Sequence, residues 1–240
     1  MSAGWLLGAA VVAIACFVQG LAGFGIGLVA MAFLPFLMSP VTAVVLMTLY
    51  AAIFALVIFV PLRRDVTPAP VIELLVATLV GLPAGVWLLA TLPVSLLNRL
   101  IGALLVGLTV LEVFGLYPRH LEGRRWRLGA GVISGLLGGA VGTPGPPVVA
   151  YAQTQSWSAR TQKANLQAFL VVNQTATLVG YWWAGLLTAE VGRVAALYAL
   201  PALAGLAVGM LLFGRIPERV FRRVVFAVLF VSGVVLLLRG

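Results

Sequence analysis

The sequence predicts an all-α integral membrane protein with two inverted-topology repeats, each a glycine-broken helix pair (re-entrant or short) plus three transmembrane helices. Three observations predict this class: the composition, the spacing of apolar runs, and a duplicated glycine-rich segment. Of the 240 residues, 62% are hydrophobic and 9% are charged, whereas a soluble domain is closer to half apolar and a quarter charged. No polar stretch is longer than a short loop, so we expect one membrane domain.

Ten apolar runs follow one another along the chain, with proline-containing turn signals between many of them. They cover residues 4–19, 21–38, 41–62, 70–91, 96–116, 127–141, 144–155, 163–186, 191–212 and 219–238. Runs near 20 residues can cross a bilayer of roughly 30 Å. The first two runs, and the sixth with the seventh, are short for a crossing. We expect each short pair to form a hairpin whose glycine tip lies inside the membrane, surrounded by protein or water.

The glycine-rich segments 20–27 and 135–142 interrupt these two short pairs. At an offset of 115 residues, Gly20 aligns with Gly135 and Gly27 with Gly142. A second set of matches has an offset of 124 and consists of Gly81, Gly85, Pro93 and Arg99 with Gly205, Gly209, Pro217 and Arg223. We therefore divide the chain into a first repeat, 1–117, and a second, 118–240. Inverted repeats let secondary transporters form two opposite-facing states; Gly81, Gly85, Gly205 and Gly209 are expected to allow close helix packing.

The chain is basic, with 15 Lys and Arg against 6 Asp and Glu. We expect no nucleic-acid partner, because cytoplasmic loops of membrane proteins gather basic residues. If each short pair returns to its starting side, twelve basic residues lie on one side: Arg63, Arg64, Arg119, Arg124, Arg125, Arg127, Arg160, Lys163, Arg215, Arg219, Arg222 and Arg223. If each pair were one broken crossing, the basic residues from Arg63 to Arg127 would lie on the opposite side of the membrane from those between Arg160 and Arg223. The first arrangement is favoured and leaves both termini outside the cytoplasm.

Helices that start inside a membrane present unpaired N–H groups and a positive dipole end, which bind anions. We expect such starts near Gly25 and near Pro146, pointing at one central site. Proline suits a helix's first turn, glycine lets an anion approach the backbone, and Thr143 adds a hydroxyl. The candidate substrate-binding residues are Gln19, Gly20, Gly23, Phe24, Gly25, Gly27, Gly138, Gly139, Gly142, Thr143, Gly145 and Asn173.

The run 163–186 is unusually polar for a membrane segment. Asn165, Phe169, Asn173 and Thr177 recur every four residues, which puts them on one helix face. Neutral polar groups are costly in hydrocarbon without partners, so they either line the pathway or hold helices together; both interpretations stay open. Arg99 and Arg223 either attract anions or anchor the chain at the interface. The pathway candidates are Thr48, Tyr50, Asn165, Gln174, Thr177, Arg99 and Arg223.

Little in the sequence indicates an enzyme, a metal site or a cofactor. Cys16 is the only cysteine, and His120, the only histidine, is in an arginine-rich loop. A nucleophile and its base need to lie within hydrogen-bond reach, so we expect no catalytic residues. Glu73 and Glu112 are each about one turn inside a membrane edge, where carboxylates more often pair with loop arginines than relay protons. The absence of a midplane carboxylate cluster favours anions over cations.

The glycine segments also carry a family resemblance. Gly20 to Gly27 followed by Pro35-Phe36-Leu37, and Gly138 to Pro147 leading into Tyr151 and Arg160, resemble the TauE/SafE family of sulfite and organosulfonate exporters. The resemblance spans essentially the whole chain and implies a multi-pass carrier of the bacterial inner membrane for sulfite, sulfoacetate or other sulfonates. Phe24 and Ile26 stand where family members often carry glycine. Transport of another small anion, a non-transporting role in an assembly complex, and homo-oligomer formation stay open.

Overall fold

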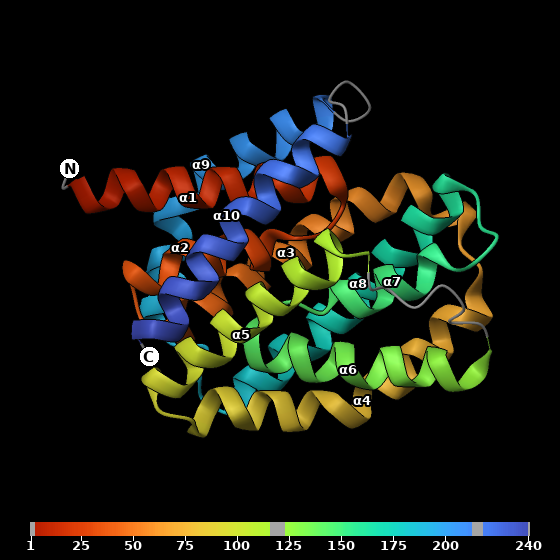
Figure 1. The fold of residues 1–240 in the computed structure, drawn as a ribbon, viewed down its shortest axis with the longest axis horizontal. Coiled ribbons are helices and arrows are strands. Elements are labelled where there is room, and N and C mark those ends of the chain that lie inside the picture. The colour runs from red at the N-terminus through yellow and green to blue at the C-terminus, as the bar shows by residue number, and fades with distance from the viewer. Residues whose placement is uncertain (1–2, 116–122, 213–217, 240) are drawn as a thin grey trace. The chain divides into compact units, whose positions relative to one another are not determined.

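The computed structural model describes residues 3–115, 123–212 and 218–239 (Figure 1). Within these ranges every regular element is a helix, and the ten α-helices follow the order of the ten apolar runs. They are α1 (Ala3–Ala22), α2 (Ile26–Phe33), α3 (Pro40–Phe59), α4 (Pro68–Thr91), α5 (Val94–Val113), α6 (Arg124–Val141), α7 (Gly145–Gln153), α8 (Ala159–Trp183), α9 (Ala189–Leu211) and α10 (Glu218–Arg239). Two short 3-10 helices, η1 (Leu34–Phe36) and η2 (Val60–Asp65), follow α2 and α3.

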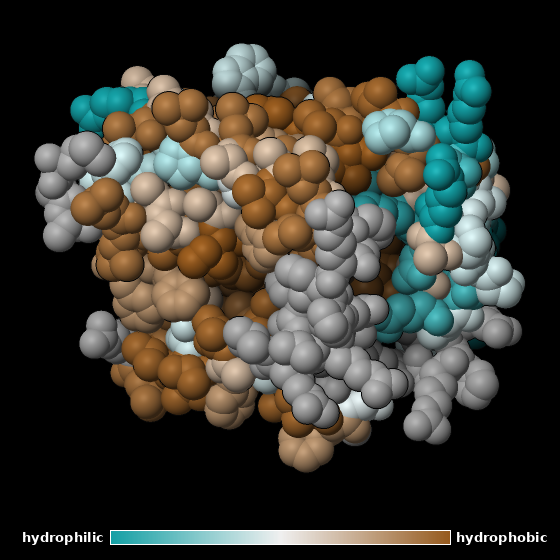
Figure 2. All heavy atoms as spheres, turned by 90° about the horizontal axis from the view of Figure 1, so that it is seen from above, coloured by the Kyte–Doolittle hydropathy of each residue, from teal (hydrophilic) through white to brown (hydrophobic). Residues whose placement is uncertain are grey.

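Apolar side chains cover much of the surface. Five helical stretches of the described chain are long and apolar enough to cross a bilayer: Gly4–Ala22, Pro40–Asp65, Pro68–Thr91, Val94–Leu111 and Ala189–Leu211. Large apolar residues such as Val80 and Leu200 are 70% and 80% exposed, and Figure 2 shows apolar residues over much of the face in view. Exposed apolar surface on this scale needs lipid around it. The chain is a multi-pass membrane protein.

The chain divides into two compact units, each built from both halves of the sequence. Unit 1 consists of Met1–Met47, Leu92–Tyr117 and Thr188–Gly240, and so contains α1, α2, the start of α3, α5, α9 and α10. Unit 2 consists of Thr48–Thr91 and Pro118–Leu187, and contains the rest of α3, η2, α4, α6, α7 and α8. The division into repeats at 117/118 stays a prediction.

In unit 1, α1 packs closely against α9 because glycines remove the side chains at their crossing. A Cβ added at Gly20 would lie 2.5 Å from the carbonyl oxygen of Leu206. Conversely, Gly205 and Gly209 lie directly against the α1 backbone. A second close crossing joins α5 to α10, where a Cβ at Gly102 would lie 2.6 Å from the Gly233 carbonyl oxygen.

Unit 2 contains a matching crossing, between α4 and α6, which run side by side in Figure 1. A Cβ at Gly139 would lie 2.7 Å from the Leu82 carbonyl oxygen, and Gly81 and Gly85 lie directly against the α6 backbone. The Thr78 hydroxyl also donates a 2.9 Å hydrogen bond to the carbonyl of Gly131 in α6. The packing role expected for Gly81, Gly85, Gly205 and Gly209 is confirmed.

The two crossings correspond residue by residue, and this corrects the sequence alignment. Gly20 meets Leu206 and Met210, while Gly139 meets Leu82 and Val86. Residues of α6 therefore correspond to residues of α1 at an offset of 119, whereas residues of α9 correspond to residues of α4 at an offset of 124. Helix boundaries agree: α1 and α6 end at residues 22 and 141, α2 and α7 begin at 26 and 145, and α3 and α8 begin at 40 and 159.

The expected offset of 115 was wrong by four residues, which is one helical turn. Gly131, Gly135 and Gly139 recur every four residues along the α6 face that packs on α4. Because residues four apart lie on one helix face, sliding the alignment by a turn still matches glycine with glycine. The expected boundary near Gly20 was wrong for the same reason. That glycine is a packing residue inside α1, and the helix pair is 20 and 8 residues long rather than two similar lengths.

Candidate functional site

The non-helical part of each pair is three residues long: break 1 (residues 23–25) in unit 1 and break 2 (residues 142–144) in unit 2. In break 1, Gly23 and Gly25 have φ of 82° and 98°, values that L side chains rarely adopt. The Gly23 N–H donates to the Gln19 carbonyl at 2.8 Å, and Gln19 Nε2 donates to the Gly23 carbonyl at 3.3 Å. Gln19 therefore holds the end of α1 through its backbone and its side chain.

Break 2 is held more firmly. Gly142, with φ of 68°, donates its N–H to the Gly138 carbonyl at 3.0 Å, and the Thr143 N–H donates to the Leu137 carbonyl at 3.3 Å. The Gly142 bond is the 5→1 bond of the αL motif, which closes many helices on glycine. The Tyr181 hydroxyl from α8 lies 3.1 Å and 2.8 Å from the carbonyl oxygens of Gly138 and Gly139, to which it donates.

One further hydrogen bond ties break 2 to the helix before it. The fully buried hydroxyl of Ser134, in α6, donates to the Pro144 carbonyl at 2.7 Å. Neither Ser134 nor Tyr181 was a sequence candidate. A single hydroxyl in an apolar or glycine-rich helix forms no periodic pattern, so the sequence does not indicate which group it will bond.

The two breaks offer very different numbers of backbone donors. The first four N–H groups of a helix have no acceptor within it. In α2 these belong to Gly25, Ile26, Gly27 and Leu28, and the Val29 N–H starts the helical bonding by donating to the Gly25 carbonyl at 3.1 Å. Break 1 therefore presents the complete set of N–H groups of a helix start.

The same four positions of α7 hold three prolines. Pro144, Pro146 and Pro147 have no N–H, so Gly145 alone supplies a backbone donor. Proline in the first turn fits the helix geometry, as the sequence predicts. These prolines also remove most of the N–H donors that an anion at the start of α7 would need. The sequence analysis overlooked this consequence. Any anion at break 2 must be bound largely by side chains.

Buried polar side chains lie beside break 2. A Cβ built on Gly138 would lie 3.1 Å from Asn173 Oδ1 and 3.1 Å from the Cβ of Pro144, so both residues border the same face of Gly138. Asn173 is 0% exposed and Thr143 is 4% exposed. Asn173 Nδ2, Asn173 Oδ1 and Thr143 Oγ1 have no hydrogen-bond partner among the described residues. Burying such groups unpaired costs about 1–3 kcal/mol each.

The other polar candidates of α8 are buried too, but two of them are bonded within the protein. Asn165 Oδ1 accepts a 2.7 Å hydrogen bond from the Thr67 N–H just before α4. The Thr177 hydroxyl donates to the Asn173 carbonyl of its own helix at 2.8 Å. Gln174 is 2% exposed, and its Oε1 has no partner among the described residues. Asn173, Gln174 and the Nδ2 group of Asn165 are therefore the parts of the α8 candidates with bonding capacity left for a solute.

The remaining candidates lie apart from this cluster or help to hold it. Thr48 is fully buried and hydrogen-bonds the Tyr181 side chain, whereas Tyr50 stacks on Phe54 with ring centroids 5.7 Å apart. Arg99 is exposed on α5. The side chains of Arg223 and Glu112, and the whole of His120, lie outside the described residues.

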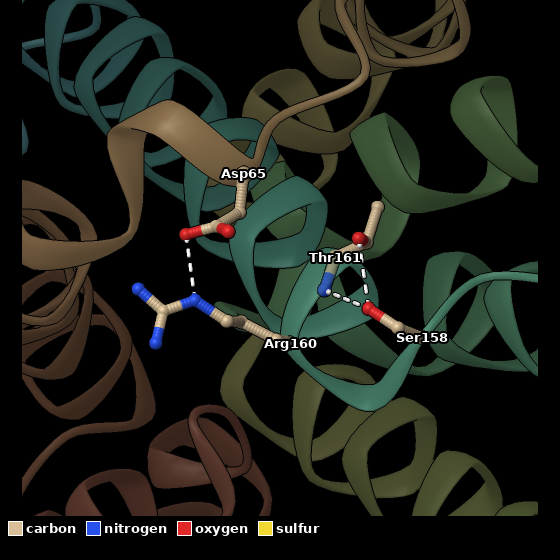
Figure 3. Close-up of polar contacts among 4 residues, drawn as sticks. All are labelled: Asp65, Ser158, Arg160 and Thr161. Carbon is tan, nitrogen blue, oxygen red and sulfur yellow. Dashed lines mark hydrogen bonds and ion pairs between the residues drawn. The ribbon is translucent and has the colours of Figure 1, made fainter.

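Ion pairs gather at one end of unit 2. Figure 3 shows Arg160, at the start of α8, donating from Nε to Asp65 Oδ2 at 2.8 Å, beside the Ser158 side chain that caps this helix. Glu73 Oε2 lies 3.2 Å from Arg127 Nη1 and 3.6 Å from Arg124 Nε. The expected pairing of Glu73 with arginines is confirmed, although both arginines are in the first turn of α6 rather than in a loop. The contact between Asp65 and Arg160 also disfavours a broken crossing, which would put these two residues on opposite sides of the membrane.

Arg127 also shows that α7 turns back along α6. Its Nε donates to the Tyr151 hydroxyl at 2.9 Å, although Arg127 is in the first turn of α6 and Tyr151 is near the end of α7. The guanidinium carbon lies 5.8 Å from the Tyr151 ring centroid, which adds a cation–π contact. The α6–α7 pair is therefore a hairpin whose tip is break 2.

Comparison with known families gives one match. The family model described as Sulfite exporter TauE/SafE matches residues 7–236, which includes both breaks and nearly all of both units. Searches of curated proteins and of solved structures gave no match.

Proposed function

The chain belongs to the sulfite exporter TauE/SafE family, and we propose that it is a secondary transporter that exports small sulfur-containing anions such as sulfite or sulfonates. The anion binds at the glycine-rich breaks. The observation that carries this proposal is the set of buried, unpaired polar atoms of Asn173 and Thr143 beside the start of α7. Buried polar groups are normally hydrogen-bonded, so these atoms are suited to bind a solute.

Break 1 supports the same proposal in another way. The four N–H groups at the start of α2 and the positive end of its dipole suit a negatively charged oxygen. Residues 26–28 are buried, so an anion that approaches them leaves bulk water. The glycines at positions 23, 25 and 27 keep the backbone accessible.

We also propose that the two halves form inverted repeats that interconvert two opposite-facing states. Support comes from the matched crossings, in which each half contributes one helix to each crossing: α1 with α9, and α6 with α4. Exchange of helices between repeats explains why the units do not coincide with the halves 1–117 and 118–240. Inverted repeats with broken helices are a common basis of alternating access.

The orientation follows from the charged end of unit 2. Because the positive-inside rule assigns arginine-rich ends to the cytoplasm, residues 63–65, 124–127 and 160–163 are cytoplasmic. Both termini are then non-cytoplasmic. The family resemblance implies the bacterial inner membrane as the location. Arg124 is exposed, so Arg124→Cys tests this directly in an otherwise cysteine-free Cys16→Ala background. A membrane-impermeant thiol reagent added outside intact cells should leave it unlabelled. Labelling from outside contradicts the orientation.

Transport is tested with purified, full-length protein in liposomes. Radiolabelled sulfite loaded inside should leave faster than from protein-free vesicles. Gly27→Leu and Gly142→Leu should abolish this flux while the protein still inserts, and Gly129→Leu is the matched control because no atom lies within 4 Å of a Cβ at Gly129. Absence of flux for sulfite and sulfonates contradicts the substrate class, and normal flux in both variants contradicts the site.

A further inference from the structure

Within the described part of unit 2, no cationic side chain lies near break 2. In unit 2 the basic residues near α6, α7 and α8 lie toward the other end of the hairpin. Arg127 precedes Val141 by fourteen residues, about 21 Å of helix, and Lys163 precedes Asn173 by ten residues, about 15 Å. Arg127 is also held by Glu73 and Tyr151. The groups at break 2 that can meet an anion are therefore neutral.

Neutral groups compensate a limited amount of charge. A helix start is equivalent to roughly half an elementary charge, and in α7 a single N–H, that of Gly145, can contact the ligand directly. Hydrogen bonds from Asn173 and Thr143 add partial charges only. A buried ionised group needs a partner for its charge. A second negative charge on the same head group would have none at this break.

The bonding capacity of Asn173 leads to the same conclusion. Its side chain has a donor, Nδ2, and an acceptor, Oδ1, and both are buried and unpartnered among the described residues. The choice between the two amide orientations does not matter, because each presents one donor and one acceptor. An acceptor favours a ligand that has its own hydrogen, as hydrogensulfite does, and it repels the weakly charged oxygens of a monoanion less than the more strongly charged oxygens of a dianion such as sulfate. A fully ionised dianion has no hydrogen to donate, and its oxygens would be repelled by Oδ1.

We infer that break 2 selects singly charged oxyanions over doubly charged ones, with Asn173 as the residue that determines this specificity. The inference rests on the proposed transport of sulfur-containing anions and narrows it. Hydrogensulfite and simple alkanesulfonates fit this class, whereas sulfate and the fully ionised form of sulfite do not.

Competition in wild-type proteoliposomes tests the inference without any substitution. Efflux of radiolabelled sulfite is measured against increasing methanesulfonate, which has one charge, or sulfate, which has two. We expect methanesulfonate to inhibit at a concentration about tenfold or more below that of sulfate, because burial of the extra charge has to cost at least one factor of ten. Equal or stronger inhibition by sulfate overturns the inference while the sulfite flux itself still supports the proposed function. Absence of sulfite flux overturns the proposed function, and the inference with it.

Two variants then assign the selectivity to Asn173. Asn173→Asp keeps the shape but adds a negative charge, and Asn173→Leu removes both the donor and the acceptor. Methanesulfonate should raise the thermal unfolding temperature of the purified wild-type protein and should lose this effect in both variants. The control is Thr175→Val, because Thr175 is exposed on the same helix and bonds its own helix at Val171. Stabilisation of Asn173→Asp by methanesulfonate to the wild-type extent overturns the role of this residue.

Discussion

Break 1 and break 2 have the same backbone plan but different chemistry. Both follow a helix that crosses a partner on glycine, both begin with a glycine at positive φ, and both lead into a short helix three residues later. Break 1 then offers four backbone N–H groups, and break 2 offers one. Similar helix packing therefore gives the two breaks the same backbone shape. The groups that can bond a ligand nevertheless differ, being mainly backbone N–H groups in break 1 and mainly side chains in break 2.

Matching the halves at the offset of 119 shows where the side-chain polarity lies. Ser134 corresponds to Ala15, Thr143 to Phe24, Asn173 to Phe54 and Tyr181 to Leu62. Each polar residue around break 2 thus corresponds to an apolar residue in the first half. Because prolines remove the N–H donors of α7, polar side chains take their place. The first half keeps its backbone donors and has apolar residues at these positions.

The largest expected effect concerns the shared part of the comparison, the glycine crossings. Gly20→Leu and Gly139→Leu each force a side chain into the backbone of the partner helix, at Leu206 and at Leu82. Each should lower the free energy of unfolding by more than about 3 kcal/mol, since overpacking of a tight contact already costs about 1–3 kcal/mol for smaller additions. Little folded protein should be recovered by size-exclusion chromatography in either case.

The matched controls are glycines of the same helices that face open space. No atom lies within 4 Å of a Cβ added at Gly4 in α1 or at Gly129 in α6. Gly4→Leu and Gly129→Leu should give wild-type amounts of folded protein. If only one of the two crossing variants were damaged, the crossings would not be equivalent.

The second prediction concerns the side-chain donors of break 2. Thr143→Val keeps the volume and removes a buried hydroxyl, so methanesulfonate should inhibit sulfite efflux about ten- to a hundredfold more weakly, corresponding to about 1.5–3 kcal/mol for a hydrogen bond to a charged ligand. The corresponding change in break 1, Phe24→Leu, should alter inhibition by about threefold or less. An equal effect of both variants would mean that the breaks do not differ in the way their groups suggest.

Much of the fold follows from the sequence, since ten apolar runs correspond to ten helices in order. The starts of α2 and α7 were expected within one residue of where they lie, because glycine and proline mark breaks in both. The four-residue alignment error arose where periodic packing glycines hide a shift of one turn. The two units were not foreseeable, because exchange of α4 and α9 between the halves depends on tertiary contacts that leave no mark in local sequence.

Some of the residues at the candidate site could be identified from the sequence, and others could not. Asn173 and Thr143 were identified because polar residues in apolar helices stand out. Asn165 stood out equally, yet its Oδ1 accepts from the backbone of Thr67 and only its Nδ2 is unpartnered among the described residues. The structure alone distinguishes these cases. Ser134 was missed since a lone serine among glycines also suits simple close packing.

The third prediction concerns how firmly break 2 is held. Ser134→Ala removes the hydrogen bond to the Pro144 carbonyl and reproduces the residue at the matching position, Ala15. The free energy of unfolding should fall by about 1 kcal/mol, the usual contribution of one hydrogen bond, and thermal unfolding in detergent measures it. Ser156→Ala, an exposed position of the same unit, is the control and should be unchanged. An unchanged Ser134→Ala would mean that the remaining hydrogen bonds, which include those of the Gly142 and Thr143 N–H groups, hold the break without it.

The smallest expected effect tests the difference in backbone donors most directly. Gly27 and Pro146 occupy the same position, the second residue of α2 and of α7. Gly27→Pro removes an N–H from break 1, and Pro146→Ala adds one to break 2. Because one interaction with a helix start contributes about 0.3–1 kcal/mol, the first should weaken and the second should strengthen inhibition of sulfite efflux by methanesulfonate, about two- to fivefold each.

Two further substitutions separate the N–H from the change of side chain. Gly27→Ala keeps the N–H at break 1, and Pro83→Ala adds an N–H at an exposed position inside α4, a helix that contains neither break. Gly27→Ala should weaken inhibition by methanesulfonate less than Gly27→Pro does, and Pro83→Ala should leave it unchanged. If Gly27→Pro weakened inhibition while Pro146→Ala had no effect, the backbone of α2 would bind the anion and that of α7 would not. If neither swap had an effect, side chains would do all of the binding, and the N–H groups of break 1 would have a structural role only.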